Sequence, residues 1–187
     1  YIAGLNVTIP YKEQVMSYLD DVDDSVKEIG AVNVVKVFWN DKKPYLKGYN
    51  SDVYGFEQSL LPMLESHHQR ALILGTGGAS KAVAYVMNRL KIPFTFVSRT
   101  PRHTNEITYS DVTREAILSH SIIVNTSPIG MFPYSDNCPD IPYEYLTPNH
   151  LVYDLIYNPE QTLFLQNSEE RGAKVKNGIE MLFLQAK

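Results

Sequence analysis

The second half of the chain alternates short apolar runs with longer amphipathic stretches. The apolar runs have the length of strands, and the stretches between them carry apolar residues at helical spacing. Strands are predicted at 71–74, 94–98, 121–125, 151–155 and 174–176, and helices at 79–90, 112–118 and 163–171. This alternation predicts βαβ units, and therefore a parallel sheet that is covered by helices on both faces.

The first half has a more mixed pattern. Its predicted elements are strands at 5–9, 31–38 and 45–49, helices at 11–19 and 53–65, a short helix ending near residue 30, and a turn at 40–44. Pro10 suits a helix start, and Ser51-Asp52 is expected to cap the longer helix. The pattern changes near Ser66, which predicts a domain boundary there, with His67 and His68 exposed in a linker rather than binding a metal.

Composition narrows the class of protein. With 44% hydrophobic and 20% charged residues and a mean hydropathy of -0.22, the chain is expected to form a soluble globular protein. A net charge of -4 without a basic stripe argues against nucleic-acid binding. No apolar stretch reaches the ~18 residues that a membrane span needs. No cluster of residues has the spacing of metal ligands, so no metal is expected.

The cysteine content indicates the compartment. Cys138 is the one cysteine, which excludes an internal disulfide and predicts a reducing, cytoplasmic location. The thiol itself is expected to be an unreactive group in a loop.

A glycine-rich segment follows the apolar run at 71–74 and precedes a helical pattern. Gly75, Gly77 and Gly78 suit a strand-to-helix turn that places backbone N–H groups against a pyrophosphate. Ser80 stands where such a fingerprint has glycine or alanine, so a glycine loop without a nucleotide remains open. Arg99 ends the next predicted strand, where a carboxylate would hold the ribose of NAD. A guanidinium there favours the 2′-phosphate of NADP(H), the alternative being an ordinary surface cation.

A second group of polar residues lies in the first half of the chain. Thr8, Lys12, Asn33 and Asp52 all fall at predicted junctions between strands and helices, where they can converge on a small polyhydroxylated ligand. Singly, Lys12 would be a surface lysine and Asp52 a helix cap. Together they can exchange a proton with an oxygen that gains or loses charge. The sequence leaves the lysine pKa open, because a carboxylate partner favours the charged form and burial the neutral one.

Eight segments then occur in the order seen in shikimate dehydrogenases, and the chain resembles that family over essentially its whole length. They are 6–12, 30–33, 50–52, the glycine loop, 98–100, 125–131, 154–159 and 177–182. The resemblance implies an NADP-dependent, reversible reduction of 3-dehydroshikimate to shikimate. It also implies an α/β fold of two lobes, with residues 1–66 as a substrate lobe and 67–176 as a Rossmann-like NADP-binding lobe. The segment 177–187 would form a helix that packs back on the first lobe.

The resemblance also assigns roles to individual residues. Lys12 and Asp52 would form the catalytic pair. Substrate contacts would come from Thr8, Asn33, Tyr157 and Gln185. Cofactor contacts would come from Gly75, Gly77, Gly78, Ala79, Ser98, Arg99, Thr100, Arg102, Thr126, Met131 and Gly178.

The chain departs from the family pattern in three places. No strand–helix–strand unit with a Ser-x-Ser motif precedes Tyr1, so the chain reads as a fragment whose first lobe is truncated. The second phosphate-binding cation would be Arg102, displaced by one position, and the last helix is short. A relative that oxidises quinate or uses NAD, and a non-catalytic dinucleotide-binding fragment, remain alternatives. A monomer or a homodimer is expected.

Overall fold

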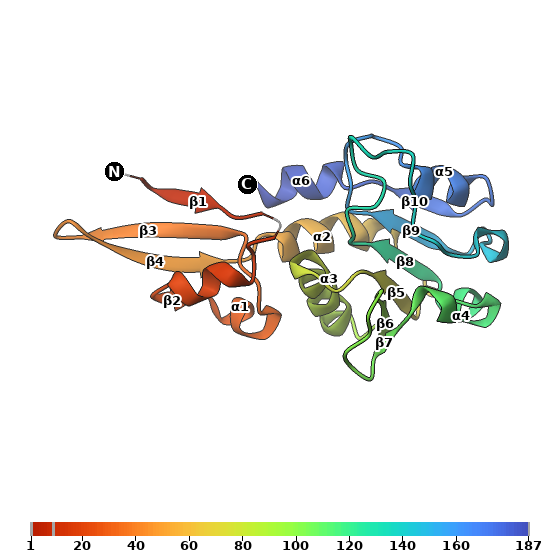
Figure 1. Ribbon diagram of the computed structural model, residues 1–187, viewed down its shortest axis with the longest axis horizontal. Helices are drawn as coiled ribbons and strands as arrows, with labels where there is room; N and C mark the ends of the chain where they lie inside the picture. The colour runs from red at the N-terminus through yellow and green to blue at the C-terminus, as the bar shows by residue number, and fades with distance from the viewer. Residues whose placement is uncertain (1, 9, 187) are drawn as a thin grey trace.

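The computed structural model describes residues 2–8 and 10–186. The N-terminal part forms a four-stranded mixed sheet in the order β1-β3-β4-β2 (Figure 1). Its strands are β1 (Gly4–Asn6), β2 (Asp21–Val22), β3 (Val34–Asn40) and β4 (Lys43–Tyr49). Strand β3 pairs antiparallel with both β1 and β4, and β2 pairs parallel with β4. The predicted strand at 5–9 ends at Asn6 in β1, and its last residue lies outside the described residues.

The turn between β3 and β4 is tighter than the predicted loop at 40–44. Asp41 and Lys42 alone form it, with φ angles of 44° and 68°. Two consecutive residues with positive φ give a two-residue hairpin, whose twist matches that of the flanking strands. Pro44 therefore lies inside β4, opposite Trp39, rather than in a loop.

The predicted helix at 11–19 is wrong. The segment forms a five-residue 3₁₀ turn, η1 (Gln14–Tyr18). An α-helix through this region would need the Lys12 carbonyl for its own ladder, but that oxygen accepts a hydrogen bond from Val32 N at 2.8 Å. The following helix, α1 (Asp24–Ile29), forms as predicted and ends at Gly30, which has a φ of 69°.

The rest of the chain builds a six-stranded sheet in the order β10-β9-β8-β5-β6-β7, with every neighbouring pair parallel. Its strands are β5 (Ala71–Leu74), β6 (Phe94–Val97), β7 (Glu106–Ile107), β8 (Ile122–Asn125), β9 (Leu151–Asp154) and β10 (Lys174–Lys176). The helices between them are α3 (Gly78–Arg89), α4 (Arg114–Ser119) and α5 (Leu163–Glu169), with short 3₁₀ turns η3 (Tyr109–Asp111) and η4 (Tyr143–Tyr145). The chain thus has the predicted α/β fold, a small mixed sheet joined to a parallel one.

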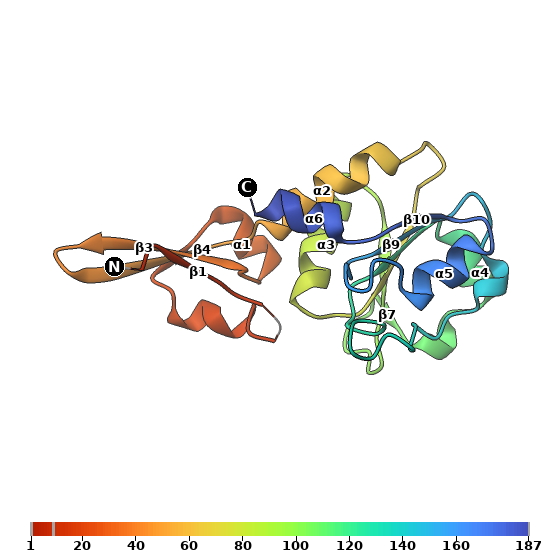
Figure 2. The same cartoon turned by 90° about the horizontal axis from the view of Figure 1, so that it is seen from above.

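Helices cover both faces of the parallel sheet, as Figure 2 shows. Ile73 points into a core shared with α3, while its neighbour Leu72 points into a second core shared with α4 and α5. All four residues of β5 are buried, which explains why its sequence is a continuous apolar run rather than an alternating one.

Helix α2 (Asp52–Leu60), followed by the turn η2 (Leu61–Met63), is shorter than the predicted helix at 53–65. It packs against α6 (Ile179–Gln185) and α3 on one face of the parallel sheet. Phe56 meets Tyr153 of β9 edge to face at 5.1 Å between ring centroids, and Ser59 Oγ lies 2.7 Å from the Tyr153 hydroxyl. The helix that follows the small sheet is therefore anchored in the core of the large one. The domain boundary near residue 66 stays a prediction.

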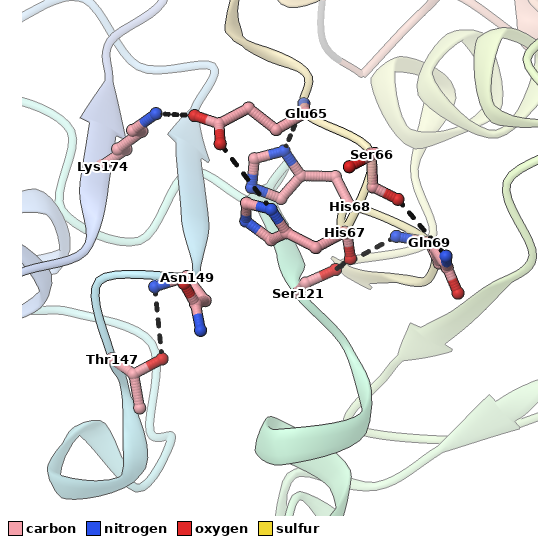
Figure 3. Close-up of polar contacts among 9 residues, drawn as sticks. All are labelled: Glu65, Ser66, His67, His68, Gln69, Ser121, Thr147, Asn149 and Lys174. Carbon is pink, nitrogen blue, oxygen red and sulfur yellow. Dashed lines mark hydrogen bonds and ion pairs between the residues drawn. The ribbon is translucent and has the colours of Figure 1, made fainter.

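The linker between η2 and β5 corrects one expectation. His67 is exposed, but His68 is buried, with 5% of its surface accessible. Figure 3 shows both rings beside Glu65, where the linker meets Lys174 of β10; their centroids lie 4.2 Å apart. His68 Nδ1 accepts from Glu65 N at 2.8 Å, and burial lowers the pKa of His68. His68 is thus part of the packing at the edge of the sheet where the strands begin.

Two kinds of feature are absent from the part of the chain that the structure describes. No helix in it is both long and apolar enough to cross a membrane. No group of three or more His, Cys, Asp or Glu side chains in it is arranged to hold a metal ion.

Candidate active site

The parallel sheet reverses its strand order between β5 and β8. From β5 the chain proceeds outward to β6 and β7 on one side, and then to β8, β9 and β10 on the other. In open α/β sheets, ligands bind outside the carboxyl ends of the strands at such a point. The segments that leave β5 and β8, beginning at Gly75 and Thr126, therefore define the expected site.

The turn after β5 requires glycine at its first position. Gly75 has a φ of 111°, and a Cβ there would lie 2.9 Å from Thr126 Oγ1. Its N–H donates to Val97 O at 2.8 Å, and Thr126 Oγ1 donates to Leu74 O at 2.8 Å. Thr126 therefore fixes the two segments against each other through a hydroxyl that is turned into the protein.

The glycine loop continues into the N-terminus of α3, with Ala79 in its first turn. Gly77 is the N-cap, and a Cβ at that position would meet nothing within 4 Å. Ser80 is buried and donates its hydroxyl to Gly77 O at 2.6 Å. The serine that replaces the usual glycine or alanine therefore forms a hydrogen bond within the loop. The result is open space in front of a 12-residue helix whose N-terminus favours an anion.

Lys12 and Asp52 form an ion pair, with 2.6 Å between Nζ and Oδ2. Their side chains expose 13% and 3% of their surface. The second carboxylate oxygen, Oδ1, accepts from Asn33 Nδ2 at 2.9 Å. Asp52 thus lies in the first turn of α2 without acting as the N-cap that the sequence suggested, because both of its oxygens face the small sheet.

Asn33 is held by the residue that precedes α2. Its Oδ1 accepts from Ser51 N at 2.8 Å, and its Nδ2 lies 3.1 Å from Ser51 Oγ. One amide side chain therefore fixes both the start of α2 and the orientation of the Asp52 carboxylate.

The pair lies directly against the glycine loop. A Cβ added to Gly78 would come within 2.9 Å of Lys12 Cβ and 3.7 Å of Ala31 Cβ. The absence of a side chain at Gly78 therefore lets the Lys12 segment pack on the N-terminus of α3. The structure therefore places the Lys12–Asp52 pair beside the loop that the sequence predicts to bind a pyrophosphate.

Three other predicted substrate residues are less closely joined to this pair. Thr8 is exposed, and its carbonyl accepts from Tyr11 N at 2.9 Å. Tyr157 is half-exposed in the loop after β9. Gln185 lies on α6, where its Cβ is 3.3 Å from the position of a Cβ at Gly55. Among the described residues, no hydrogen bond links these three side chains to Lys12 or Asp52.

The residues after β6 form an exposed turn. Thr100 N donates to Ser98 Oγ at 3.2 Å, and Arg102 N donates to Glu106 Oε2 at 2.7 Å. The guanidinium groups of Arg99 and Arg102 are exposed, and neither forms an ion pair within residues 2–8 and 10–186. Both can therefore bind a phosphate group bidentately.

The last predicted cofactor residues lie around the loops after β8 and β9. Met131 is exposed in the first loop. Gly178 precedes α6 and approaches the second loop so closely that a Cβ would lie 2.0 Å from Leu155 O. A buried carboxylate, Asp154, stands between these loops and has no role in the sequence-based account. Its position at the start of the segment 154–159 was the one signal for it, since no pattern in the sequence shows that Asn125 and Thr162 bond to it.

Comparisons with known proteins show which proteins the chain is similar to. A family model described as the shikimate dehydrogenase substrate binding domain matches residues 1–35. A shikimate dehydrogenase (NADP(+)) from Desulforamulus reducens is 36% identical over 203 residues, which cover 98% of this chain and 68% of the relative.

Solved structures give the same result. A chorismate mutase/shikimate 5-dehydrogenase fusion protein from Clostridium acetobutylicum superposes with a TM-score of 0.83 at 35% identity, over 98% of this chain and 68% of the other. A shikimate 5-dehydrogenase from Thermus thermophilus, solved with NADP(H) and shikimate, gives a TM-score of 0.82 at 29% identity, over 98% and 70%. Each superposition therefore runs through both sheets.

Proposed function

The chain belongs to the shikimate dehydrogenase family, and from this premise we propose that it reversibly reduces 3-dehydroshikimate to shikimate with NADPH. The observation that carries the proposal is the Lys12–Asp52 ion pair, packed against Gly78 at the start of α3. A group that can move a proton then lies beside the loop expected to hold the nucleotide. The relatives' names supply the substrate, which the geometry by itself does not specify.

The residues present are compatible with NADP(H). Open space at Gly77 in front of α3 suits a pyrophosphate, for which Gly75, Gly78 and Ala79 complete the loop. Arg99 and Arg102 suit the 2′-phosphate. We assign Ser98 and Thr100 to the same adenosine end, and Thr126, Met131 and Gly178 to the border of the nicotinamide.

When bound, the cofactor supplies the hydride that reaches the carbonyl carbon of the substrate. Lys12 Nζ gives its proton to the carbonyl oxygen, which becomes the new hydroxyl, and takes it back in the reverse direction. Asp52 holds the Lys12 ammonium through Oδ2, while Asn33 keeps the carboxylate from rotating. Thr8, Tyr157 and Gln185 are proposed to contact the remaining hydroxyl and carboxylate groups.

The test follows NADP(H) absorbance with shikimate, with quinate and without substrate. Lys12→Ala should lower shikimate turnover at least a hundredfold, because general acid–base catalysis typically contributes about 10²–10⁴-fold. Lys27→Ala is the matched control, since it removes an exposed lysine–aspartate pair of similar length, 2.7 Å, on α1. Undiminished turnover in Lys12→Ala refutes the proton-transfer role.

Further outcomes separate the alternatives. Faster turnover of quinate than of shikimate would make the chain a quinate-oxidising relative. NADP(H) binding without turnover of either substrate would make it a non-catalytic dinucleotide-binding protein. Arg99→Ala should weaken NADP(H) far more than NAD(H), whereas the exposed Arg171→Ala should weaken neither; equal loss for both cofactors contradicts the 2′-phosphate assignment. The cytoplasmic location and the monomeric or homodimeric state stay predictions.

A further inference from the structure

A buried carboxylate joins the two loops that border the proposed nicotinamide site. Asp154 ends β9 and has no accessible surface. Its Oδ1 accepts from Asn125 Nδ2 at 3.0 Å and from Ile156 N at 3.1 Å, and its Oδ2 accepts from Thr162 Oγ1 at 2.6 Å. The three donors come from the end of β8, from the loop after β9 and from the residue before α5. One side chain therefore ties the end of β8 to both ends of the connection between β9 and α5.

The network reaches the loop after β8 through Asn125. The Oδ1 of Asn125 accepts from Ser127 N at 3.0 Å and from Ser127 Oγ at 2.7 Å, and its Nδ2 also lies 3.4 Å from Ile129 O. The amide of Asn125 is oriented by Asp154, because an amide presents its N–H groups on one side and its oxygen on the other. The loop that begins at Thr126 is thus shaped by a carboxylate on the neighbouring strand.

We propose that Asp154 is a positioning residue of the reductase site: its carboxylate holds the loops after β8 and β9 in the arrangement that receives the nicotinamide and the substrate. This inference rests on the proposed function. Asp154 itself touches neither reactant in this scheme. It acts through Asn125 and Ser127 on one loop, and through Ile156 on the other.

The chemistry of the network requires the ionised carboxylate. All three partners donate hydrogen bonds, so a proton on Asp154 would compete with one of them. Burial raises the pKa of Asp154 to about 6, while the bonds from Thr162, Ile156 and Asn125 oppose that rise. The titratable group that interacts electrostatically with Asp154 is Tyr143 of η4. Burial raises the pKa of Tyr143 above its usual range, and the charge of Asp154 adds to this rise. Arrangement of the loops, and hence activity, should therefore be lost as the pH falls through about 6.

The test removes one donor without changing side-chain volume. Thr162→Val deletes the hydroxyl that bonds Asp154 Oδ2, and Thr162→Ser restores it. Because Thr162 is also the N-cap of α5, Thr113→Val is the matched control: Thr113 caps α4 in the same way but lies outside the network. The activity of each variant is measured from pH 5 to 8.

Loss of the donor should move the acidic limb of kcat/KM about one pH unit towards neutrality. Thr162→Val then has about threefold lower relative activity at pH 6.5, since its ionised fraction falls from about three quarters to one quarter. Thr162→Ser and Thr113→Val should keep the limb of the original protein. A limb that does not move in Thr162→Val overturns the proposal.

A second measurement separates this inference from the proposed function. Hydrogen exchange of the Ser127 and Ile156 amides, which the network bonds, is followed without any ligand. Thr162→Val should lower their protection while leaving the amides of β5 unchanged, and Thr162→Ser should not. If no substrate is turned over but these amides respond as described, the proposed function fails while the structural coupling stands. If the amides do not respond, the positioning role fails whatever the activity.

Discussion

The Lys12–Asp52 pair offers a sharp test of how the site is held together. Asp52 uses both oxygens, one for Lys12 and one for Asn33. Asparagine has one acceptor oxygen, so Asp52→Asn must leave one of these two donors facing an amide N–H group. Lys12→Met removes the cation instead and leaves a carboxylate that is 3% exposed with a single side-chain donor.

The magnitudes follow from burial. Breaking a buried pair by removing one partner costs about 3–5 kcal/mol, and the lower end applies here because Lys12 keeps some contact with water. A hydrogen bond to a charged group contributes about 1.5–3 kcal/mol, which gives a similar cost of about 3 kcal/mol for Asp52→Asn. In the double variant, Lys12→Met with Asp52→Asn, neither an unpaired carboxylate nor an unpaired ammonium remains. Its loss of unfolding free energy should therefore also be about 3–4 kcal/mol. The expected coupling free energy is therefore about 2–3 kcal/mol.

Urea denaturation of the original protein, both single variants and the double variant measures this coupling. The matched cycle uses Lys27 and Asp24 on α1, whose charged atoms lie at a similar distance but whose side chains are 60% and 96% exposed. Solvent and salt should leave that pair without measurable coupling. If the Lys12–Asp52 cycle gives no more coupling than the Lys27–Asp24 cycle, the geometry is not maintained in solution and the argument for a preorganised proton donor fails.

Two further predictions concern stability. Gly178→Ala should lower the free energy of unfolding by about 3 kcal/mol, because its Cβ would lie 2.0 Å from Leu155 O. Gly77→Ala is the control and should change the free energy of unfolding little, because its Cβ meets open space. Equal effects of the two substitutions in thermal unfolding would contradict the packing argument. Because burial lowers the pKa of His68, the unfolded chain binds a proton on this side chain more tightly than the folded chain does. The contribution of neutral His68 to the free energy of unfolding is therefore complete above pH 6.5 and is lost as the pH falls below it. Unfolding at pH 5 and pH 7.5 should show a smaller loss in His68→Asn, and an unchanged one in the exposed His67→Asn.

The parallel sheet could be predicted closely from the sequence. Strands β5 and β10 have the predicted bounds, and β8 and β9 differ by one residue at one end. Strands β5, β8 and β9 are buried along their whole length, so each apolar run coincides with the strand itself. Strand β6 also ends one residue before its predicted end, whereas the two-residue strand β7 was not predicted.

The small sheet was harder to predict because contacts distant in sequence decide its local structure. Val32 N takes the carbonyl of Lys12 that a helix would need, and nothing in residues 11–19 announces this. The Asp41-Lys42 turn lacks the glycine that usually marks positive φ. His68 is buried by a fold that its own neighbourhood in sequence does not reveal.

The candidate site shows the same division. Lys12, Asn33 and Asp52 could be selected from their positions at junctions of predicted elements. Their bonding pattern could not, since it depends on how α2 packs against the parallel sheet. The hydrogen bond from Thr162 to Asp154 could not be predicted from the sequence either, because it depends on how the loop after β9 folds back.

The anchoring of α2 has a mechanical consequence. Phe56 fastens this helix to the core of the parallel sheet, so Asp52 moves with the large body of the molecule. The Lys12 carbonyl accepts a hydrogen bond from Val32 N, and Asn33 N donates one to Tyr49 O of β4. Both residues are therefore bonded to the small sheet. The hydrogen bonds from Lys12 and Asn33 to Asp52 therefore connect the small sheet to the parallel sheet, and their lengths depend on the angle between the two sheets. Any rotation of the small sheet against the parallel sheet would therefore have to stretch or break the hydrogen bonds from Lys12 and Asn33 to Asp52.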